Sequence, residues 1–330
     1  MLRRPSGEID PADFELRQVP IPAPGEGEVL VRTLLLSIDA ANRAWMNAMP
    51  TYKPPVPVGG VMEGVTVGRV EASRDPRFSP GDLVEGFGGW QDYAVERAGA
   101  LYPLTPREPL TQWVNALGVA GKTAYFGVRE VGRPRPGDQV LVSGAAGSVG
   151  SLAAQIARLS AEGVRVVGVA GGERKCRWLT EELGLDGAID YKGEDVGRAI
   201  DRHLPDGVDL FFDNVGGRTL QLALLRMRRH GRVVCCGAVS TYNDTVAKRG
   251  PAGVPALLTI RSLTMQGFVV TDYYAPAVRA AAEAQLAEWI DAGALVARDD
   301  VVAGLEHAPD ALRGLFRGDN IGKRMVRVAT

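Results

Sequence analysis

A glycine-rich turn between an apolar run and an amphipathic stretch constrains the fold of this chain more than any other feature. The turn reads Gly144-Ala145-Ala146-Gly147-Ser148-Val149-Gly150 and follows the apolar run 139–143. Helical periodicity continues from it over about 148–161. A strand, a glycine turn and a helix in this order predict a dinucleotide site, because glycine lets the backbone approach a pyrophosphate at a helix N-terminus. A purely structural turn is the alternative in a chain with 41 glycines.

Strand-like and helical segments alternate after this turn. Continuous apolar strands separated by helices are typical of a parallel sheet that is covered on both faces. The segments therefore predict an α/β fold with a doubly wound sheet, followed by a last helix over about 275–292. The strand-like runs are 165–170, 187–190, 208–213, 231–237 and 263–270, and the helical patterns are 173–183, 195–204 and 217–228.

The two ends of the chain differ from this middle part. Residues 1–116 are rich in β patterns and are punctuated by Pro-Gly pairs at 24–25 and 80–81. The tail 295–330 has two more strand-like runs and resembles the N-terminal region. We therefore expect the tail to complete a first domain of residues 1–116, with 117–294 forming a second domain.

Composition excludes several classes of protein. A formal net charge of −1 and a sequence pI of 6.4 give no electrostatic footprint for nucleic acid or an anionic membrane. No apolar run approaches the ~18 residues that span a bilayer, and the start of the chain lacks the apolar stretch of a secretory signal. Three clustered cysteines are too few for a disulfide framework. We expect a cytoplasmic protein.

The end of the second strand indicates which dinucleotide binds. An NAD site usually has an acid there for the ribose 2′-hydroxyl, but this strand ends Val169-Ala170-Gly171-Gly172. Lys175, one turn further on, can pair with a 2′-phosphate, although it could also be a solvated helix lysine. Glu173 is expected to point outward at the helix start, and Tyr191 could close the same pocket. The prediction is NADPH.

The positions of histidine and cysteine argue against a zinc site. Residues 1–116 contain neither residue type, which leaves no plausible ligand set for a catalytic zinc. We expect His203 and His230 near helix C-termini, with 226–229 as a helix end. Cys235 and Cys236 are expected in a strand core, as small apolar residues.

Without a Lewis acid, hydride transfer to a conjugated acceptor is easier than oxidation of a plain alcohol. In an α,β-unsaturated ketone or aldehyde, the negative charge moves to the carbonyl oxygen, where hydrogen-bond donors can stabilise an enolate. The sequence therefore favours an enone or quinone reductase that acts on a small conjugated carbonyl compound. A non-catalytic NADPH-binding protein is the alternative from a different class.

Several segments together resemble the zinc-independent medium-chain reductases, in particular the group of prostaglandin reductases, leukotriene B4 12-hydroxydehydrogenases and plant alkenal double-bond reductases. The resemblance covers nearly the whole chain. It includes the glycine turn and the segments 52–56, 89–93, 117–118, 123–125, 213–217 (Asp-Asn-Val-Gly-Gly), 236–243 (Cys-Gly-Ala-Val-Ser-Thr-Tyr-Asn), 265–268 and 318–323.

The resemblance implies a fold, an activity and a set of site residues. The fold is a β-rich GroES-like catalytic domain over 1–116, completed by 295–330, and a Rossmann-type NADPH-binding domain over 117–294. The activity is reduction of the C=C bond of α,β-unsaturated ketones and aldehydes, with NADPH:quinone reduction as the alternative. The implied cofactor-binding residues are Gly147, Ser148, Val149, Gly150, Lys175, Tyr191, Asn214, Cys236, Gly237, Ala238, Tyr242, Phe268, Val269, Val270 and Asn320.

Two tyrosines carry the implied catalytic role. Tyr242 is expected near the nicotinamide ribose and the substrate carbonyl, and Tyr52 is expected to line the substrate pocket. A phenol can donate to a developing enolate without losing its proton near neutral pH; either ring could instead be only an aromatic wall. For Asn214, a turn residue in the left-handed backbone region is the alternative.

Three further expectations concern the surroundings of the site. Lys122 and Glu63 stand at positions that differ from relatives, so the substrate preference is left open. Residues 243–255 are expected to form a lid loop. The run 263–270 is expected at the edge of the sheet, where it could pair with a second copy to give a homodimer.

Overall fold

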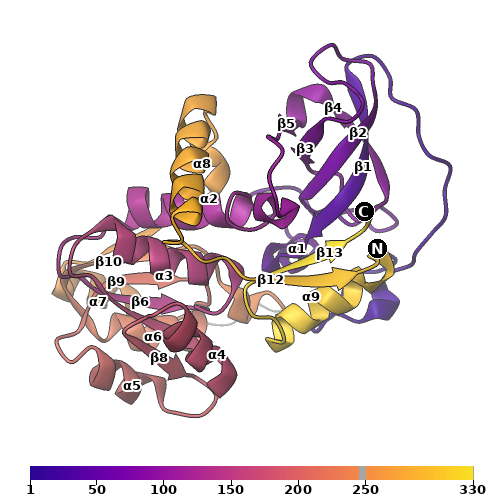
Figure 1. Ribbon diagram of the computed structural model, residues 1–330. Helices are drawn as coiled ribbons and strands as arrows, with labels where there is room; N and C mark the ends of the chain where they lie inside the picture. The colour runs from indigo at the N-terminus through magenta and orange to yellow at the C-terminus, as the bar shows by residue number, and fades with distance from the viewer. Residues whose placement is uncertain (245–249, 330) are drawn as a thin grey trace. The chain divides into compact units, whose positions relative to one another are not determined.

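The computed structural model describes residues 1–244 and 250–329, which form two compact units (Figure 1). The first unit contains residues 1–114, 242–244 and 299–329. The second unit contains residues 115–241 and 250–298. The first unit is therefore built from both ends of the chain and from the short segment 242–244, and the second unit is built from the residues between them.

The second unit is built on a parallel sheet with the strand order β11-β10-β9-β6-β7-β8. From the central β6 the chain adds β7 and β8 on one side, then β9, β10 and β11 on the other. This reversal confirms the predicted doubly wound α/β class, and the predicted edge position of the sixth strand is also confirmed. The strands are β6 Gln139–Ser143, β7 Arg165–Ala170, β8 Gly187–Asp190, β9 Val208–Asp213, β10 Met227–Cys235 and β11 Thr264–Gly267.

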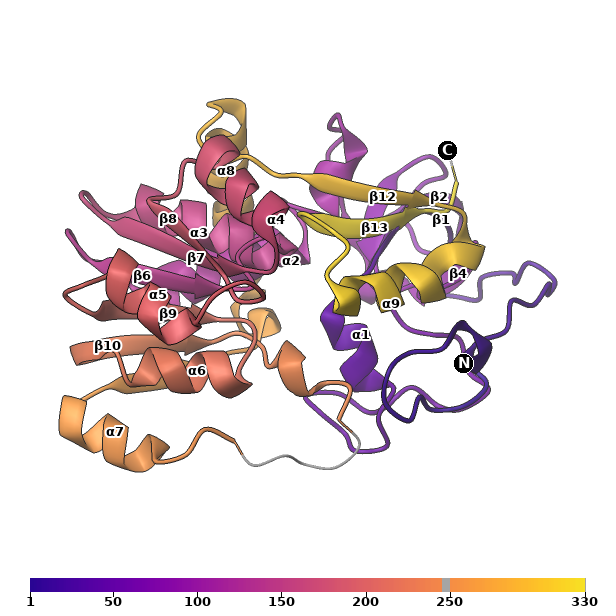
Figure 2. The same cartoon turned by 90° about the horizontal axis from the view of Figure 1, so that it is seen from below.

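Helices follow these strands because parallel neighbours require crossover connections. The helices are α2 Val119–Phe126, α3 Ser148–Ser160, α4 Glu173–Arg177, α5 Val196–His203, α6 Gly217–Leu224, α7 Val254–Arg261 and α8 Pro276–Asp291, with wider turns η4 Gly127–Gly132 and η5 Trp178–Glu182 and short turns η6 Val239–Thr241 and η7 Val270–Tyr273. In Figure 2, α7 runs beside β10, and α6 packs on β9. None of the helices described in 1–244 and 250–329 combines the length and apolar character needed to cross a bilayer.

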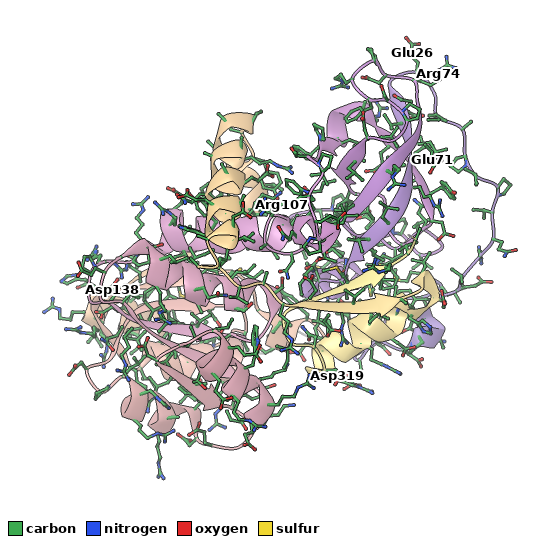
Figure 3. All side chains as sticks on the ribbon, in the orientation of Figure 1. Glu26, Glu71, Arg74, Arg107, Asp138 and Asp319 are labelled. Atoms are coloured by element: carbon green, nitrogen blue, oxygen red, sulfur yellow. The ribbon has the colours of Figure 1, made fainter. Side chains whose placement is uncertain are left out.

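An ion pair closes the amino end of the sheet. Asp138, labelled in Figure 3, stands directly before β6, and its carboxylate pairs with the guanidinium of Arg232 in β10. The candidate functional residues lie at the opposite edge of the sheet, where the parallel strands end.

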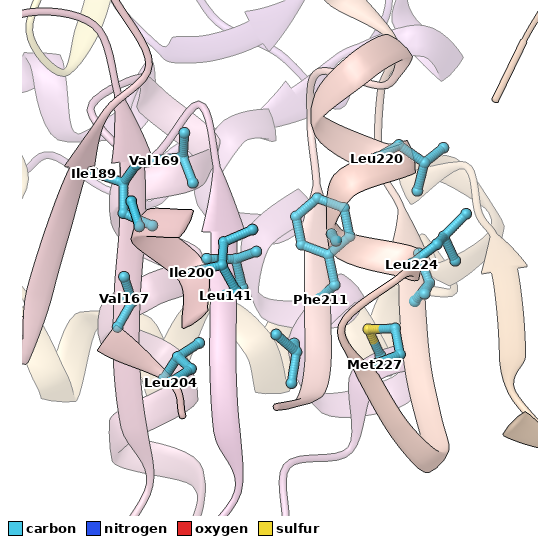
Figure 4. Close-up of a cluster of buried hydrophobic side chains, with 14 residues drawn as sticks. Leu141, Val167, Val169, Ile189, Ile200, Leu204, Phe211, Leu220, Leu224 and Met227 are labelled. Carbon is cyan, nitrogen blue, oxygen red and sulfur yellow. The ribbon is translucent and has the colours of Figure 1, made fainter. Parts of the chain in front are cut away.

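The core of the second unit fills the space between the sheet and the helices α5 and α6 (Figure 4). Leu141, Val167 and Phe211 project from three neighbouring strands, and each is fully buried. Ile200 of α5 and Leu224 of α6 meet them. Burial of each such side chain contributes about 1.5–3 kcal/mol, so this layer holds the strand ends in fixed positions.

The first unit is a mixed sheet with the order β12-β13-β1-β2-β3-β5, in which β4 also pairs with β1. The tail strand β13 runs antiparallel to β1, with Leu36 opposite Val326. Apolar side chains from both ends of the chain therefore share one core, including Ile38, Trp45 and Leu312. The elements are η1 Pro11–Asp13, β1 Glu28–Ser37, α1 Ala40–Trp45, β2 Thr66–Ser73, β3 Leu83–Gly86, β4 Tyr93–Arg97, η2 Ala98–Ala100, β5 Tyr102–Pro103, η3 Leu110–Trp113, β12 Asp299–Ala303, η8 Leu305–His307, α9 Ala308–Arg317 and β13 Lys323–Arg327.

The structure corrects the prediction around His230. Residues 226–229 were expected to end a helix, but α6 ends at Leu224 and β10 begins at Met227. His230 lies inside β10 with φ +63°, where the register against β9 shifts between Met227 and Arg232. The register shift marks a bulge in β10, and the left-handed backbone at His230 does not continue a helix. His203, by contrast, is the last residue of α5, as predicted.

The segment around β11 also differs from the prediction. The strand ends at Gly267, and Val270 already begins the turn η7. Within the predicted lid loop 243–255, residues 245–249 lie outside the described residues, and Val254 and Pro255 belong to α7. The apolar run 263–270 is therefore a short strand followed by a turn.

Candidate active site

The carboxyl ends of four parallel strands gather most of the predicted cofactor residues of the second unit. The glycine turn follows β6, Asn214 follows β9, Cys236 follows β10 and Phe268 follows β11. Because β6 and β9 are the neighbours between which the strand order reverses, this edge is the switch point where open α/β sheets bind ligands.

The glycine turn leaves a cradle that fits a phosphate group. Gly144 has φ +59°, and a Cβ atom on Gly150 would lie 2.3 Å from the Gly144 carbonyl oxygen, so neither position accepts a side chain without strain. Gly147 caps α3, which begins at Ser148. The Ser148 hydroxyl is buried and has no hydrogen-bond partner among the described residues. A helix N-terminus with an unsatisfied buried hydroxyl is suited to a phosphate oxygen.

Asp213 is a buried residue that the sequence analysis did not single out. Its carboxylate accepts hydrogen bonds from the Ser143 hydroxyl at 2.6 Å and from the backbone N–H groups of Val215 and Gly216 at 3.0 Å. Burial is the main influence on this carboxyl and raises its pKa, while these donors act in the opposite direction. The Asp213 carbonyl oxygen accepts from Cys236 N–H at 2.9 Å. Asp213 therefore joins the ends of β6, β9 and β10.

Asn214 is held by the same cluster. Its side-chain amide donates to the Ser143 carbonyl at 2.7 Å, and its backbone N–H donates to the Ser143 hydroxyl at 2.9 Å. Asn214 is absent from the described non-glycine residues with positive φ, so the left-handed turn alternative is wrong. Beside it, burial raises the pKa of the Cys236 thiol to about 12, which leaves a neutral, small side chain next to the turn 237–238.

The predicted nucleotide-selecting residues follow two neighbouring strands, Lys175 in α4 after β7 and Tyr191 directly after β8. The Tyr191 ring covers Gly171, where an added Cβ atom would lie 2.8 Å from Cε1 of the ring. Lys175 lies half-buried in α4. The side chain of Glu173 is 82% exposed and pairs with Arg177 at 3.7 Å, so its predicted outward orientation is confirmed. Tyr191 also lines a cavity of about 280 Å³, together with Asp195 and Arg218.

Asp190 is a second acid that the sequence analysis missed. It ends β8, and its carboxylate accepts hydrogen bonds from the backbone N–H groups of Gly172 at 2.7 Å and Lys192 at 2.9 Å. The Gly172 N–H is the main reason that the pKa of Asp190 is lowered. The carboxylate therefore fixes the loop after β7 by bonding its backbone.

The segment after β11 is fixed by aromatic contacts with α2. The Phe268 ring lies against Gly127, where an added Cβ atom would be 2.7 Å from Cζ. Tyr273 meets Phe268 at 6.4 Å between ring centroids and stacks on Phe126 at 4.7 Å. Val269 and Val270 lie between these two rings in sequence, at the start of the turn η7.

The first unit contains both predicted catalytic tyrosines. The Tyr52 hydroxyl accepts a hydrogen bond from Nε1 of Trp45 at 3.1 Å. Loss of solvent around this hydroxyl raises the pKa of Tyr52, and the nearby Tyr242 and Asp39 act in the same direction. Tyr242 follows η6 and is half-buried. Tyr52 is therefore a protonated phenol at neutral pH, in electrostatic contact with Tyr242.

Asn320 lies in the turn between α9 and β13. Its neighbour Asp319 is labelled in Figure 3, and its own side-chain amide donates to the Gly322 carbonyl at 2.9 Å. Lys323, three residues further on, is almost fully buried and donates to Oδ1 of Asp39 at 2.6 Å. This ion pair ties the turn to the start of α1.

Lys122 and Glu63, the two residues expected to influence substrate preference, each form an ion pair. Lys122 is fully buried in α2 and donates to Oε1 of Glu283 in α8 at 3.0 Å. Glu63 pairs with Lys53 in the first unit. Among the residues that the structure describes, no group of three or more His, Cys, Asp and Glu side chains is arranged to hold a metal ion.

Comparison with known proteins agrees with this geometry. Residues 1–104 match a family described as the N-terminal domain of oxidoreductase, and residues 148–289 match one described as zinc-binding dehydrogenase. The chain is 38% identical to an NADPH-dependent curcumin reductase of Escherichia coli, over 99% of this chain and 95% of that one. It is also 38% identical to a 2-alkenal reductase (NADP(+)-dependent) of Nicotiana tabacum, over 96% and 93% of the two chains.

A solved structure extends the likeness to three dimensions. The crystal structure of CurA from Vibrio vulnificus in complex with NADPH has a TM-score of 0.94 and 36% identity, and the match covers 99% of this chain and 98% of that one. A doubly wound sheet with a glycine turn at its switch point, joined in one chain to a β-rich unit, defines a medium-chain dehydrogenase/reductase.

Within that class, the chain belongs to the zinc-independent reductases, the family of prostaglandin reductases, 2-alkenal reductases and curcumin reductases. It is an oxidoreductase. The predicted resemblance is thereby confirmed.

Proposed function

We propose that this protein uses NADPH to reduce the C=C bond of α,β-unsaturated ketones and aldehydes. Hydride is transferred to the β-carbon, the π electrons move to the carbonyl oxygen as an enolate, and a proton from solvent adds at the α-carbon. NADPH becomes NADP⁺, and the product is the saturated carbonyl compound.

The choice of NADPH is supported by relatives and by the cradle itself. The Escherichia coli relative is named as NADPH-dependent, and the Vibrio structure is described in complex with NADPH. In this chain, the α3 N-terminus, the glycine turn and the buried Ser148 hydroxyl fit a pyrophosphate. Lys175 and Tyr191 would hold the 2′-phosphate, because the tip of β7 has no acid of its own.

The remaining cofactor residues would orient the nicotinamide end. Asn214, the turn 236–238 and the turn 268–270 follow neighbouring strands, so packing of the sheet fixes their spacing. Asn320 would offer an amide that can both donate and accept. When bound, NADPH supplies the hydride; these residues would hold the ring that carries it.

The observation that carries the catalytic proposal is the bond between Trp45 and Tyr52. An indole N–H can only donate, so the Tyr52 oxygen is the acceptor at 3.1 Å and its own proton is directed to another group. A phenol keeps its proton at neutral pH, and the pKa of Tyr52 is not lowered here but raised, chiefly by burial of the hydroxyl. Tyr242 and Tyr52 would therefore donate to the developing enolate oxygen, where preorganised donors act most strongly.

A substrate panel tests this proposal. Purified protein and NADPH are mixed with enones, alkenals, quinones and simple ketones, and loss of the reduced nicotinamide absorbance is followed. With NADPH deuterated at the transferable position, the proposal expects one deuterium at the β-carbon of the saturated product. Rapid consumption of quinones with no turnover of any enone would instead identify a quinone reductase, and NADPH binding without turnover would identify a non-catalytic protein.

A further inference from the structure

An ion pair lies among aromatic rings in the first unit, next to Tyr52. The Lys53 ammonium contacts the Glu63 carboxylate, and the two side chains are only 20% and 33% exposed. The atoms Nζ of Lys53 and Oε2 of Glu63 are closed off from solvent. The rings of Trp45 and Phe87 contact the Lys53 ammonium, and Tyr52 in turn contacts Trp45.

Backbone hydrogen bonds bring the segments of this arrangement together. Val56 N–H donates to the Trp45 carbonyl at 2.9 Å, which ties the Lys53 segment to the end of α1. Gly89 N–H donates to the Gly64 carbonyl at 3.1 Å, and Trp90 N–H donates to the Met62 carbonyl at 2.7 Å. The segments that carry Glu63 and Phe87 therefore run side by side. The position of the ion pair is built into the fold.

The same indole serves both the ion pair and the catalytic candidate. Nζ of Lys53 lies 4.5 Å from the centroid of Trp45 and 4.9 Å from that of Phe87, distances at which a cation is attracted to a ring face. The N–H of Trp45 donates to Tyr52. Tyr52 and Phe87 remain 61% and 41% exposed. The surface next to the Tyr52 hydroxyl is therefore formed by aromatic rings. The Glu63 carboxylate neutralises the charge of the Lys53 ammonium that contacts two of these rings.

We propose that the Lys53–Glu63 pair determines the charge of the substrates that the site accepts. Paired, the two residues disfavour a conjugated ketone with a carboxylate near Tyr52, because Glu63 repels the carboxylate and already occupies the ammonium. Without the Glu63 carboxylate, the unbalanced positive charge of Lys53 would attract such an acid. The inference deepens the proposed function and rests on it, since it takes Tyr52 to contact the substrate.

Two enones with the same skeleton test the proposal. Benzylideneacetone is uncharged, and 4-oxo-6-phenylhex-5-enoate is the same enone with one carboxylate added on the ketone side, next to the oxygen that Tyr52 would contact. The measured quantity is kcat/KM for the acid divided by kcat/KM for the neutral enone, with the full chain and saturating NADPH. Glu63→Gln is expected to raise this ratio about 10-fold or more, as for a new charged hydrogen bond, mainly through a lower KM for the acid.

Three further variants separate charge from structure. Glu63→Gln combined with Lys53→Met should lose the gain, because the gain requires the ammonium. The exchanged pair, Lys53→Glu with Glu63→Lys, keeps an ion pair in place and should retain the wild-type ratio. Glu15→Gln removes a carboxylate that pairs with Arg17 on an exposed segment and should change nothing.

Each outcome bears on a different claim. If benzylideneacetone is reduced normally and the ratio is the same in wild type and Glu63→Gln, the charge inference is overturned while the proposed function stands. The same holds if the double variant keeps the gain of the single one. If Glu63→Gln does not fold, the exchanged pair decides: a ratio shifted more than 10-fold from wild type overturns the inference. If wild type consumes neither enone, the proposed function fails, and the inference with it.

Discussion

The Ser143 hydroxyl donates a 2.6 Å hydrogen bond to Oδ1 of Asp213, so two buried polar side chains join the ends of β6 and β9. The same hydroxyl accepts from the backbone N–H of Asn214. One small side chain therefore satisfies both a buried carboxylate and the strand end that carries a proposed cofactor residue. This bond lies at the switch point of the sheet. Its loss should lower both the stability of the fold and the affinity for the cofactor.

Replacement of Ser143 by alanine should lower stability. The change removes a donor from the Asp213 carboxylate, which is only 1% exposed, and an acceptor from Asn214 N–H. We expect the free energy of unfolding to fall by about 1–3 kcal/mol, as measured by urea denaturation. Ser160→Ala, which removes a hydroxyl bonded to the Ile156 carbonyl near the end of α3, is the matched control and should have a smaller effect. Equal losses would contradict the role of the buried pair.

Lys175→Ala should weaken NADPH and leave NADH nearly unaffected. Loss of a charged hydrogen bond to the 2′-phosphate corresponds to about 10- to 150-fold in Kd. Binding of the two nucleotides can be measured by fluorescence or calorimetry. Lys192→Ala, in the turn after β8, is the control lysine. A parallel loss of affinity for both nucleotides would refute the assignment of Lys175 to the 2′-phosphate.

Tyr242→Phe should act mainly on kcat. The phenyl ring keeps the packing, but the donor to the enolate oxygen is gone, for which a loss on the order of 100-fold is typical. Tyr52→Phe should give a smaller loss of kcat, because we propose Tyr242 as the main donor to the enolate oxygen and Tyr52 as the second. Steady-state kinetics on an enone measure both. Tyr102→Phe, in β5, should be neutral, and unaltered turnover in Tyr242→Phe would remove its catalytic role.

Asp190 should make the stability of the folded protein depend on pH in the acid range. Backbone donors lower its pKa in the folded protein below the ordinary value of 3.8. The folded state therefore holds the charged form more tightly than the unfolded state, and this stabilisation is present above the ordinary value and is lost as the pH falls through the lowered one. Asp190→Asn should thus be less stable than wild type at neutral pH.

The difference in stability between wild type and Asp190→Asn should become smaller in acid. Thermal unfolding at neutral pH and below the ordinary aspartate range measures it. Asp206→Asn, at an exposed position between α5 and β9, is the charge control and should show little difference at either pH. A gap for Asp190→Asn that is constant with pH would show that its hydrogen bonds do not depend on its charge.

The edge strand β11 leads to a proposal about assembly. Only β10 pairs with it among the described strands, so its other edge can extend the sheet with a second copy across a two-fold axis. We expect a homodimer by light scattering. Gln266→Lys places like charges on both copies of the strand and should shift the population to monomers. A wild-type protein that is monomeric at micromolar concentrations would contradict this proposal.

The strands of the second unit could be predicted closely because they are buried on both faces. The runs 165–170, 187–190 and 208–213 are observed as β7, β8 and β9 without a change of bounds. Continuous apolar residues leave little choice in such a sheet. The error at 226–230 has the opposite origin: apart from Met227 these residues are basic, and the bulge that carries 228–230 between two paired parts of β10 depends on the tertiary structure.

The sequence by itself determined the doubly wound sheet, the glycine turn and the position of Lys175, because each depends on residues that are neighbours along the chain. Tertiary structure alone decided the partners of Asp213, Asp190 and Glu63. Ser143 and Asp213 are 70 positions apart, and Gly172 and Asp190 are 18 apart. No local pattern encodes such a pair, since it forms only when packing of the sheet brings the two strand ends together.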